Sequence, residues 1–112
     1  MKTPQAVVAL ASLAQDTRLA IYRLLVQQGP DGLPAGSIAE RLKLPGATLS
    51  FHLKELAHAG MVDARQDGRF VYYSANYPQM NALIGYLTEN CCSGQGCATQ
   101  PVSTPMRMRK RA

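Results

Sequence analysis

The sequence has no tryptophan, no cysteine before position 91 and no long run of apolar residues. With only two phenylalanines and five tyrosines, the core has to be built mainly from aliphatic side chains. A membrane-spanning helix needs roughly 18 consecutive apolar residues, so we expect no membrane segment. Residues 1–5 lack the charged and apolar pattern of a secretory signal. We therefore expect a cytoplasmic protein.

Positive charge is also scarce over most of the chain, although the net charge is +5. Residues 107–112 carry four of the twelve cations, which leaves eight cations against all seven anions in residues 1–106. A nearly neutral folded part does not by itself indicate a nucleic-acid partner. The case for DNA binding therefore depends on where individual cations stand, above all Lys54, Arg65 and Arg69.

Residues 46–60 form the most informative stretch. Leu49, Leu53 and Leu56 recur at the spacing that puts them on one stripe of a helix. Gly60 stands where a left-handed cap would end that helix. Away from the centre of the stripe lie short or cationic side chains, most of them hydrogen-bond donors: Thr48, Ser50, His52 and Lys54. By itself this pattern is typical of any amphipathic helix.

A β-hairpin is predicted directly after this helix. Residues 62–66 and 69–74 have the composition of short strands, and Asp67-Gly68 between them is a strong hairpin-turn signal. Another helix, at about residues 35–43, precedes residues 46–60 and is joined to them by a tight turn. This order predicts a winged helix-turn-helix, a mostly α fold with a small β-hairpin. The second helix of such a unit enters the DNA major groove, and the hairpin flanks it as a wing.

The same residues resemble the signature of the ArsR-type metalloregulatory repressors. Ser50–Leu56 matches a Ser-x-His-Leu-x-x-Leu pattern, Ala59–Val62 matches Ala-Gly-Leu-Val except for a methionine, and Asp67–Tyr73 carries the glycine and aromatics of the second wing strand. The resemblance spans about residues 5–90 and implies an operator-binding repressor. The sequence departs from the pattern at Phe51, where the family often has arginine. A cation is therefore missing from the surface that should face the groove.

Five side chains are the predicted DNA contacts. Thr48, Ser50, His52 and Lys54 would meet bases or phosphates. Arg69, on the wing, would reach a phosphate or the minor groove. We therefore expect double-stranded operator DNA as the partner.

Three further helices bring the prediction to about five helices plus a two-stranded wing. They cover residues 5–14, residues 16–28 with Asp16 as N-cap, and residues 77–90. The last helix has an apolar stripe with few core positions left to cover, formed by Met80, Leu83, Ile84 and Leu87. In the family, the first and last helices form the homodimer interface, so the resemblance implies a homodimer here. The alternative is that both helices cap the core of a monomer.

The composition changes after residue 90. Glycine, serine, threonine, glutamine and proline become frequent, and no helical or strand period continues. We therefore divide the chain into a DNA-binding and dimerisation domain at residues 1–90 and a flexible, basic, cysteine-containing tail at residues 91–112. The cations of residues 107–112 are either a solvated end or contacts to DNA phosphates.

All three cysteines, Cys91, Cys92 and Cys97, lie within seven residues. Buried structural cysteines would be scattered through the core, and a disulfide is disfavoured in a reducing cytoplasm. A soft-metal site and a redox-sensing thiol cluster remain. Structural zinc takes four ligands, whereas three thiolates without nitrogen or oxygen partners suit thiophilic As(III) or Sb(III). The cysteines also resemble the arsenite sites of some family members, while the family's Cys-x-Cys motif is absent from residues 35–43.

The main prediction is a dimeric repressor that leaves its operator when the three cysteines capture As(III) or Sb(III) as inducer. We expect no organic cofactor and no enzymatic activity. An arsenate reductase would need an anion-cradling loop beside its nucleophilic cysteine, and the sequence around Cys91–Cys97 has no such loop. A metal-buffering protein would have no use for the wing. A thiol-based redox-sensing winged-helix regulator accounts for both the wing and the cysteines, and it stays open as the alternative.

Overall fold

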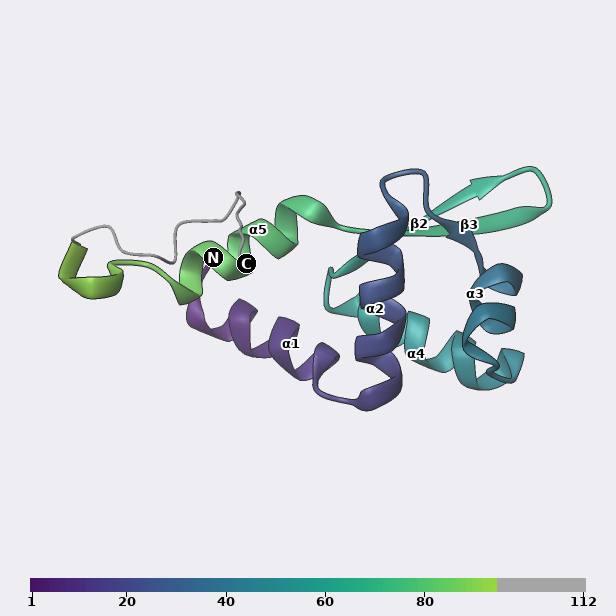
Figure 1. Cartoon of the computed structure of the whole chain (residues 1–112), viewed down its shortest axis with the longest axis horizontal. Coiled ribbons are helices and arrows are strands. Elements are labelled where there is room, and N and C mark those ends of the chain that lie inside the picture. The colour runs from purple at the N-terminus through teal and green to yellow at the C-terminus, as the bar shows by residue number, and fades with distance from the viewer. Residues whose placement is uncertain (95–112) are drawn as a thin grey trace, which may run out of the picture.

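The computed structural model describes residues 1–94 (Figure 1). Within them the chain forms five α-helices, three strands and a short 3-10 helix: α1 Thr3–Leu13, α2 Asp16–Gln28, β1 Leu33–Pro34, α3 Ala35–Leu42, α4 Gly46–His58, β2 Val62–Asp67, β3 Phe70–Ala75, α5 Tyr77–Leu87 and η1 Cys91–Gly94. The predicted winged helix-turn-helix, with α3 and α4 as its helix pair, is confirmed. Cys97 and the basic cluster at residues 107–112 lie outside the described residues.

The core is aliphatic, as the lack of tryptophan requires. The largest fully buried side chains come from α2, α3, α4 and the residue before β2. They are Ile21, Leu25, Ile38, Leu49, Leu53, Leu56 and Met61. The predicted leucine stripe of α4 is therefore its buried face. Full burial of one such side chain contributes roughly 1.5–3 kcal/mol, so this stripe holds α4 firmly in place.

The sheet has three strands in the order β1-β3-β2, all antiparallel, where two strands were predicted. Leu33 pairs with Tyr73 and Pro34 with Tyr72. Proline is tolerated in β1 because β1 is an edge strand. Gly32 precedes this pair with φ +74°, and a Cβ there would collide with the backbone oxygen of Tyr73. Glycine thus allows β1 to approach β3.

The wing turn lies one residue later than predicted. Asp67 pairs with Phe70 at the end of the β2–β3 ladder, so Gly68 and Arg69 are the two turn residues. Gly68 has φ +64°, and Arg69 has no positive φ. A glycine at the first turn position suits the type II′ hairpin, whose twist matches that of the strands. As a consequence, Arg69 lies at the tip of the wing.

Several helix ends also differ from the prediction: α1 spans Thr3–Leu13 instead of residues 5–14, and α3 ends at Leu42 instead of residue 43. Gln15, and not Asp16, is the N-cap of α2, and its side-chain oxygen accepts the Arg18 backbone N–H at 2.8 Å. Asp16 is the first helical residue, where a negative charge still favours the helix dipole. The last helix, α5, ends at Leu87, three residues before the predicted Asn90, which has φ +57°.

Asn76 connects the start of α5 to the end of α4. Its Oδ1 accepts the backbone N–H of Gln79 at 3.1 Å, which caps α5. Its Nδ2 donates to the backbone oxygen of Gly60 at 2.9 Å. Tyr77, the next residue, donates its hydroxyl to the Val26 carbonyl oxygen of α2 at 2.9 Å. The first turn of α5 is thereby fixed to the DNA-binding half of the molecule.

Candidate nucleic-acid interface

A short turn sets the angle between α3 and α4. Lys43 ends α3 in the left-handed conformation with φ +56°. Leu44 donates its backbone N–H to the Ala39 oxygen at 3.0 Å, and Pro45 stands directly before α4 with φ −60°. The ring of proline restricts φ to about this value. Pro45 therefore presets the backbone at the entry into α4.

Three of the four predicted contacts on α4 lie at the surface. Thr48, Ser50 and Lys54 are exposed. Lys54 lies on the side of α4 opposite Leu49, Leu53 and Leu56. Thr48 and Ser50 lie to either side of it. Two are short hydroxyl side chains and one is a cation, so together they can donate hydrogen bonds to bases and phosphates.

His52 does not share that surface. Its side chain is only 9% exposed, and its Nδ1 lies 3.3 Å from Nη1 of Arg18 on α2. Because a guanidinium can only donate, His52 Nδ1 has to be the acceptor in this contact. Arg18 also donates from Nε to the Ser12 backbone oxygen at 2.8 Å. His52 thus positions α4 against α2 and the end of α1, and we remove it from the predicted DNA contacts.

The wing carries one exposed cation at its tip and one that is held by the sheet. Arg69, in the turn, is exposed. Arg65 lies over the ring of Tyr72, 5.1 Å from the centroid, and donates to the Asp31 backbone oxygen at 3.4 Å. Figure 1 shows the wing and the α3–α4 pair at one end of the molecule, away from α5 and η1. Lys54 and Arg69 are therefore exposed cations at that end, where they can meet DNA phosphates.

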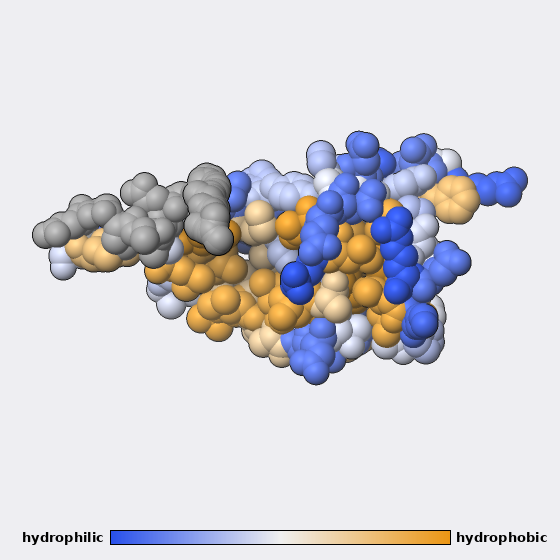
Figure 2. All heavy atoms as spheres, in the orientation of Figure 1, coloured by the Kyte–Doolittle hydropathy of each residue, from blue (hydrophilic) through white to orange (hydrophobic). Residues whose placement is uncertain are grey.

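Large apolar side chains remain exposed on α1 and α5. They form what we call the α1–α5 face: Val7, Val8, Leu10, Ile84 and Leu87, with 41–58% exposure. The inner side of α1 consists instead of the small residues Ala6, Ala9 and Ser12. Figure 2 shows the apolar side chains gathered over α1 and α5, whereas the wing end is mostly hydrophilic. The two helices are joined by a hydrogen bond between the Thr3 and Tyr86 hydroxyls.

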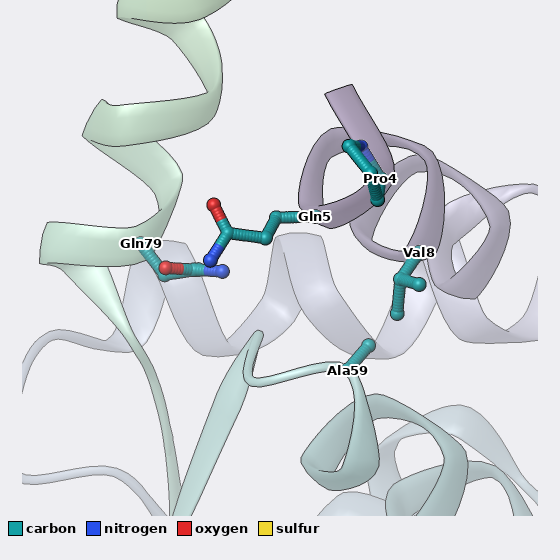
Figure 3. A pocket seen from close by; sticks show the side chains of 5 residues that line it. All are labelled: Pro4, Gln5, Val8, Ala59 and Gln79. Carbon is teal, nitrogen blue, oxygen red and sulfur yellow. The ribbon is translucent and has the colours of Figure 1, made fainter. Parts of the chain in front are cut away.

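A hollow of about 290 Å³ borders this face, between the start of α1, the end of α4 and the start of α5 (Figure 3). Gln5 and Gln79 point toward each other on one side of it, and Val8 and Ala59 line the other. A second hollow, of about 370 Å³, shares Val8 and Ala59 with the first and is also lined by Arg18, Glu55 and His58. The surface around α1 is thus uneven, with polar and charged side chains beside the exposed apolar ones.

The cysteines follow α5 directly. Cys91 is half-buried and Cys92 is exposed, both in η1, where Cys92 has φ +57°. Cys97 lies outside the described residues, and no three His, Cys, Asp or Glu side chains within residues 1–94 are grouped to hold a metal ion. The predicted three-thiol site therefore stays a prediction. None of the helices in the described part of the chain is long and apolar enough to cross a membrane.

Comparison with known proteins shows that the chain is similar to transcriptional regulators. A family sequence model described as a helix-turn-helix domain matches residues 13–65. The transcriptional activator HlyU from Vibrio cholerae is 32% identical over 88 residues, which cover 79% of each chain. The cadmium resistance transcriptional regulatory protein CadC from Listeria innocua is 39% identical over 61 residues, or 54% of this chain and 50% of that protein.

Solved structures with the same fold are also regulators. An ArsR-like transcriptional regulator from Rhodococcus sp. RHA1 matches with a TM-score of 0.69 at 25% identity, covering 81% of this chain and 82% of that chain. A homodimeric winged helix-turn-helix DNA-binding domain from Mycobacterium bovis, described as a possible ArsR-family regulator, matches with a TM-score of 0.62 at 26% identity, covering 82% and 85%. The chain belongs to the ArsR family of winged helix-turn-helix, DNA-binding transcriptional regulators.

Proposed function

We propose that the protein is a dimeric repressor that binds operator DNA through α4 and the wing and releases it on capturing trivalent arsenic or antimony. One observation carries the DNA-binding part. The leucine stripe of α4 is buried, and Thr48, Ser50 and Lys54 are left exposed at the same end of the molecule as Arg69. Hydroxyls would donate to base edges and phosphates, and the two cations would fix the register on the backbone.

Dimerisation through the α1–α5 face is supported by the exposure of its five apolar side chains. A stable monomer gains nothing from leaving them in water, whereas a two-fold interface would bury the same patch on both copies. The homodimeric Mycobacterium bovis domain matches 82% of this chain, which includes most of the described elements. A two-fold axis would set two α4 helices about one DNA turn apart, suited to a near-palindromic operator.

Induction would begin at Cys91 and Cys92, which stand one short turn after α5. We propose that they and Cys97 bind one As(III) or Sb(III) as thiolates and release their protons. Thiolate ligands favour such soft ions, and CadC is named for resistance to cadmium, another soft ion. Because α5 contributes two of the five side chains of the α1–α5 face, a change at its end would alter the spacing of the two α4 helices. A coupling of roughly 1–3 kcal/mol would lower operator affinity about 5- to 150-fold.

The experiment is a DNA-release titration with As(III), Sb(III), Zn(II) and peroxide. It uses the wild type and the variants Cys91→Ser, Cys92→Ser and Cys97→Ser. Release by arsenite that needs all three cysteines is the expected result. Release by peroxide alone would instead identify a thiol redox sensor, the alternative regulator. Arsenite release that persists in every single variant would show that the cysteines are not the sensing site.

The DNA-contact part is tested separately by salt dependence. Replacing Lys54 or Arg69 with alanine should reduce the slope of log affinity against log salt by about one unit for each phosphate that the variant no longer touches. Lys2→Ala is the matched control, because it removes a cation from the start of α1, at the opposite end of the molecule (Figure 1). Fluorescence anisotropy over a salt series measures all three. If both slopes equal that of the wild type, α4 and the wing are not the interface.

A further inference from the structure

The outward ridge of α4 carries an aromatic residue at its centre. At about 3.6 residues per turn, the positions opposite the leucine stripe are Ala47, Phe51, Lys54 and His58, spaced i, i+4, i+7 and i+11. Thr48 and Ser50 lie to either side of this ridge. Phe51 is 57% exposed, although it is a large apolar side chain on the helix that the proposed function places in the major groove.

The ring of Phe51 contacts the next side chain of the same helix. It packs edge-on against the ring of His52, with centroids 5.4 Å apart and an interplanar angle of 63°. His52 is itself buried and in contact with Arg18. An aromatic pair in this geometry is favourable beyond its buried area. The Phe51 ring is therefore in contact with a buried residue, although more than half of its surface stays exposed.

The chemistry of the ring selects what it can contact in a major groove. Phenylalanine neither donates nor accepts hydrogen bonds, so it would leave the acceptors of guanine and adenine and the amino group of cytosine without partners. Thymine alone among the four bases presents an apolar group there, its 5-methyl. On this basis we propose that Phe51 packs on the methyl group of a thymine and so sets the base preference at one position of each half-site. The inference rests on the proposed DNA binding through α4.

The exposed aromatic of the wing provides a matched control. Phe70 has almost the same exposure, 58%, but begins β3 beside the wing turn. If exposed aromatic area merely strengthened DNA binding, Phe51 and Phe70 would be equivalent. Only Phe51 stands on the ridge of the helix that would face base edges, so only Phe51 should distinguish bases by their methyl group.

The experiment starts by selecting binding sites for the wild-type protein from a random-sequence duplex pool. Each thymine of the selected site is then replaced by deoxyuridine, which removes only the methyl group. Burial of one such group should make thymine about three- to fivefold better than uracil at one position per half-site, and about ten- to twentyfold with both half-sites changed. In Phe51→Ala the ratio should fall to about one at that position, while Phe70→Ala should keep the wild-type ratio.

Phe51→Gln is a second variant that keeps a long side chain, and thermal melting checks that each variant is folded. Selected DNA that binds the wild type equally well with uracil at every position would overturn the inference and leave the proposed function intact. A methyl preference that persists in both Phe51 variants would assign it to another residue and would also overturn the inference. If no sequence is selected at all, the proposed DNA binding itself fails.

Discussion

Replacing Ile84 with serine should weaken the proposed dimer and leave the protomer folded. Ile84 lies on α5 in the α1–α5 face and is 51% exposed. Full burial of an isoleucine is worth roughly 1.5–3 kcal/mol, so covering its exposed half contributes about 0.8–1.5 kcal/mol. A two-fold interface contains the residue twice. The substitution should therefore cost the dimer about 1.5–3 kcal/mol, or roughly a 10- to 150-fold higher dissociation constant.

Sedimentation equilibrium over a range of protein concentrations measures this constant directly. Thermal melting followed by circular dichroism is the companion assay, because the melting temperature of a dimer depends on protein concentration. The matched control is Phe70→Ser, which removes a side chain of similar exposure from the wing. A folded Ile84→Ser protein that dimerises as strongly as the wild type would refute the assignment. So would an equal loss in the Phe70→Ser control, because the effect would then not belong to this face.

Three further predictions concern the stability of the fold. Leu83→Ala should lower the free energy of unfolding by about 2–5 kcal/mol in a denaturant titration, because Leu83 is only 5% exposed and the substitution would leave a cavity. A loss below about 1 kcal/mol would mean that Leu83 does not anchor α5 to the core. Asn76→Ala should cost about 1–2 kcal/mol, because it removes both the α5 cap and the bond to the Gly60 oxygen; a loss equal to that of an exposed Asn81→Ala control would contradict this. Burial, and then the neighbouring Tyr77, raises the pKa of Tyr22 to about 12 from 10.0, so the unfolded chain ionises first. The wild type should therefore lose stability from about pH 10 to 12, by roughly 1–2 kcal/mol more than Tyr22→Phe; parallel pH profiles of the two proteins would contradict it.

The prediction for Tyr22 has a second part near neutral pH. Its hydroxyl is buried and has no hydrogen-bond partner among the residues that the structure describes. Removing an unpaired hydroxyl costs no hydrogen bond, so Tyr22→Phe should be close to neutral or slightly stabilising at pH 7. A loss above about 1 kcal/mol at pH 7 would show that the hydroxyl is bonded in solution.

Local sequence signals were enough for the elements that place the DNA-binding surface. The spacing of Leu49, Leu53 and Leu56 predicted both the helix and its buried side, because a helical period can be recognised from about a dozen neighbouring residues. Asp67-Gly68 predicted the hairpin, because a turn signal is also carried by neighbouring residues. The turn itself lies one residue later, at Gly68 and Arg69. The two-residue strand β1 was missed, because nothing near Leu33 signals a partner about forty positions away.

The candidate site was harder to predict than the fold. His52 and Phe51 are neighbours on one helix. We predicted DNA contacts from hydrogen-bond donors and cations, and this criterion selected His52 and left out Phe51. The structure places His52 against Arg18 and leaves Phe51 outward. A residue at the edge of an apolar stripe is buried or exposed according to which helix packs beside it, and that helix comes from another part of the chain.

The sequence by itself determined the family, the helix-turn-helix order, the leucine face of α4 and the grouping of the three cysteines, since each is carried by neighbouring residues. Only the tertiary structure decided which side of α1 faces inward. Its inner side consists of Ala6, Ala9 and Ser12, and Val7 and Leu10 stay outside. The physical reason is that the small side chains let α1 approach its neighbours closely, and the larger ones are left for a surface that a single copy of the chain does not provide.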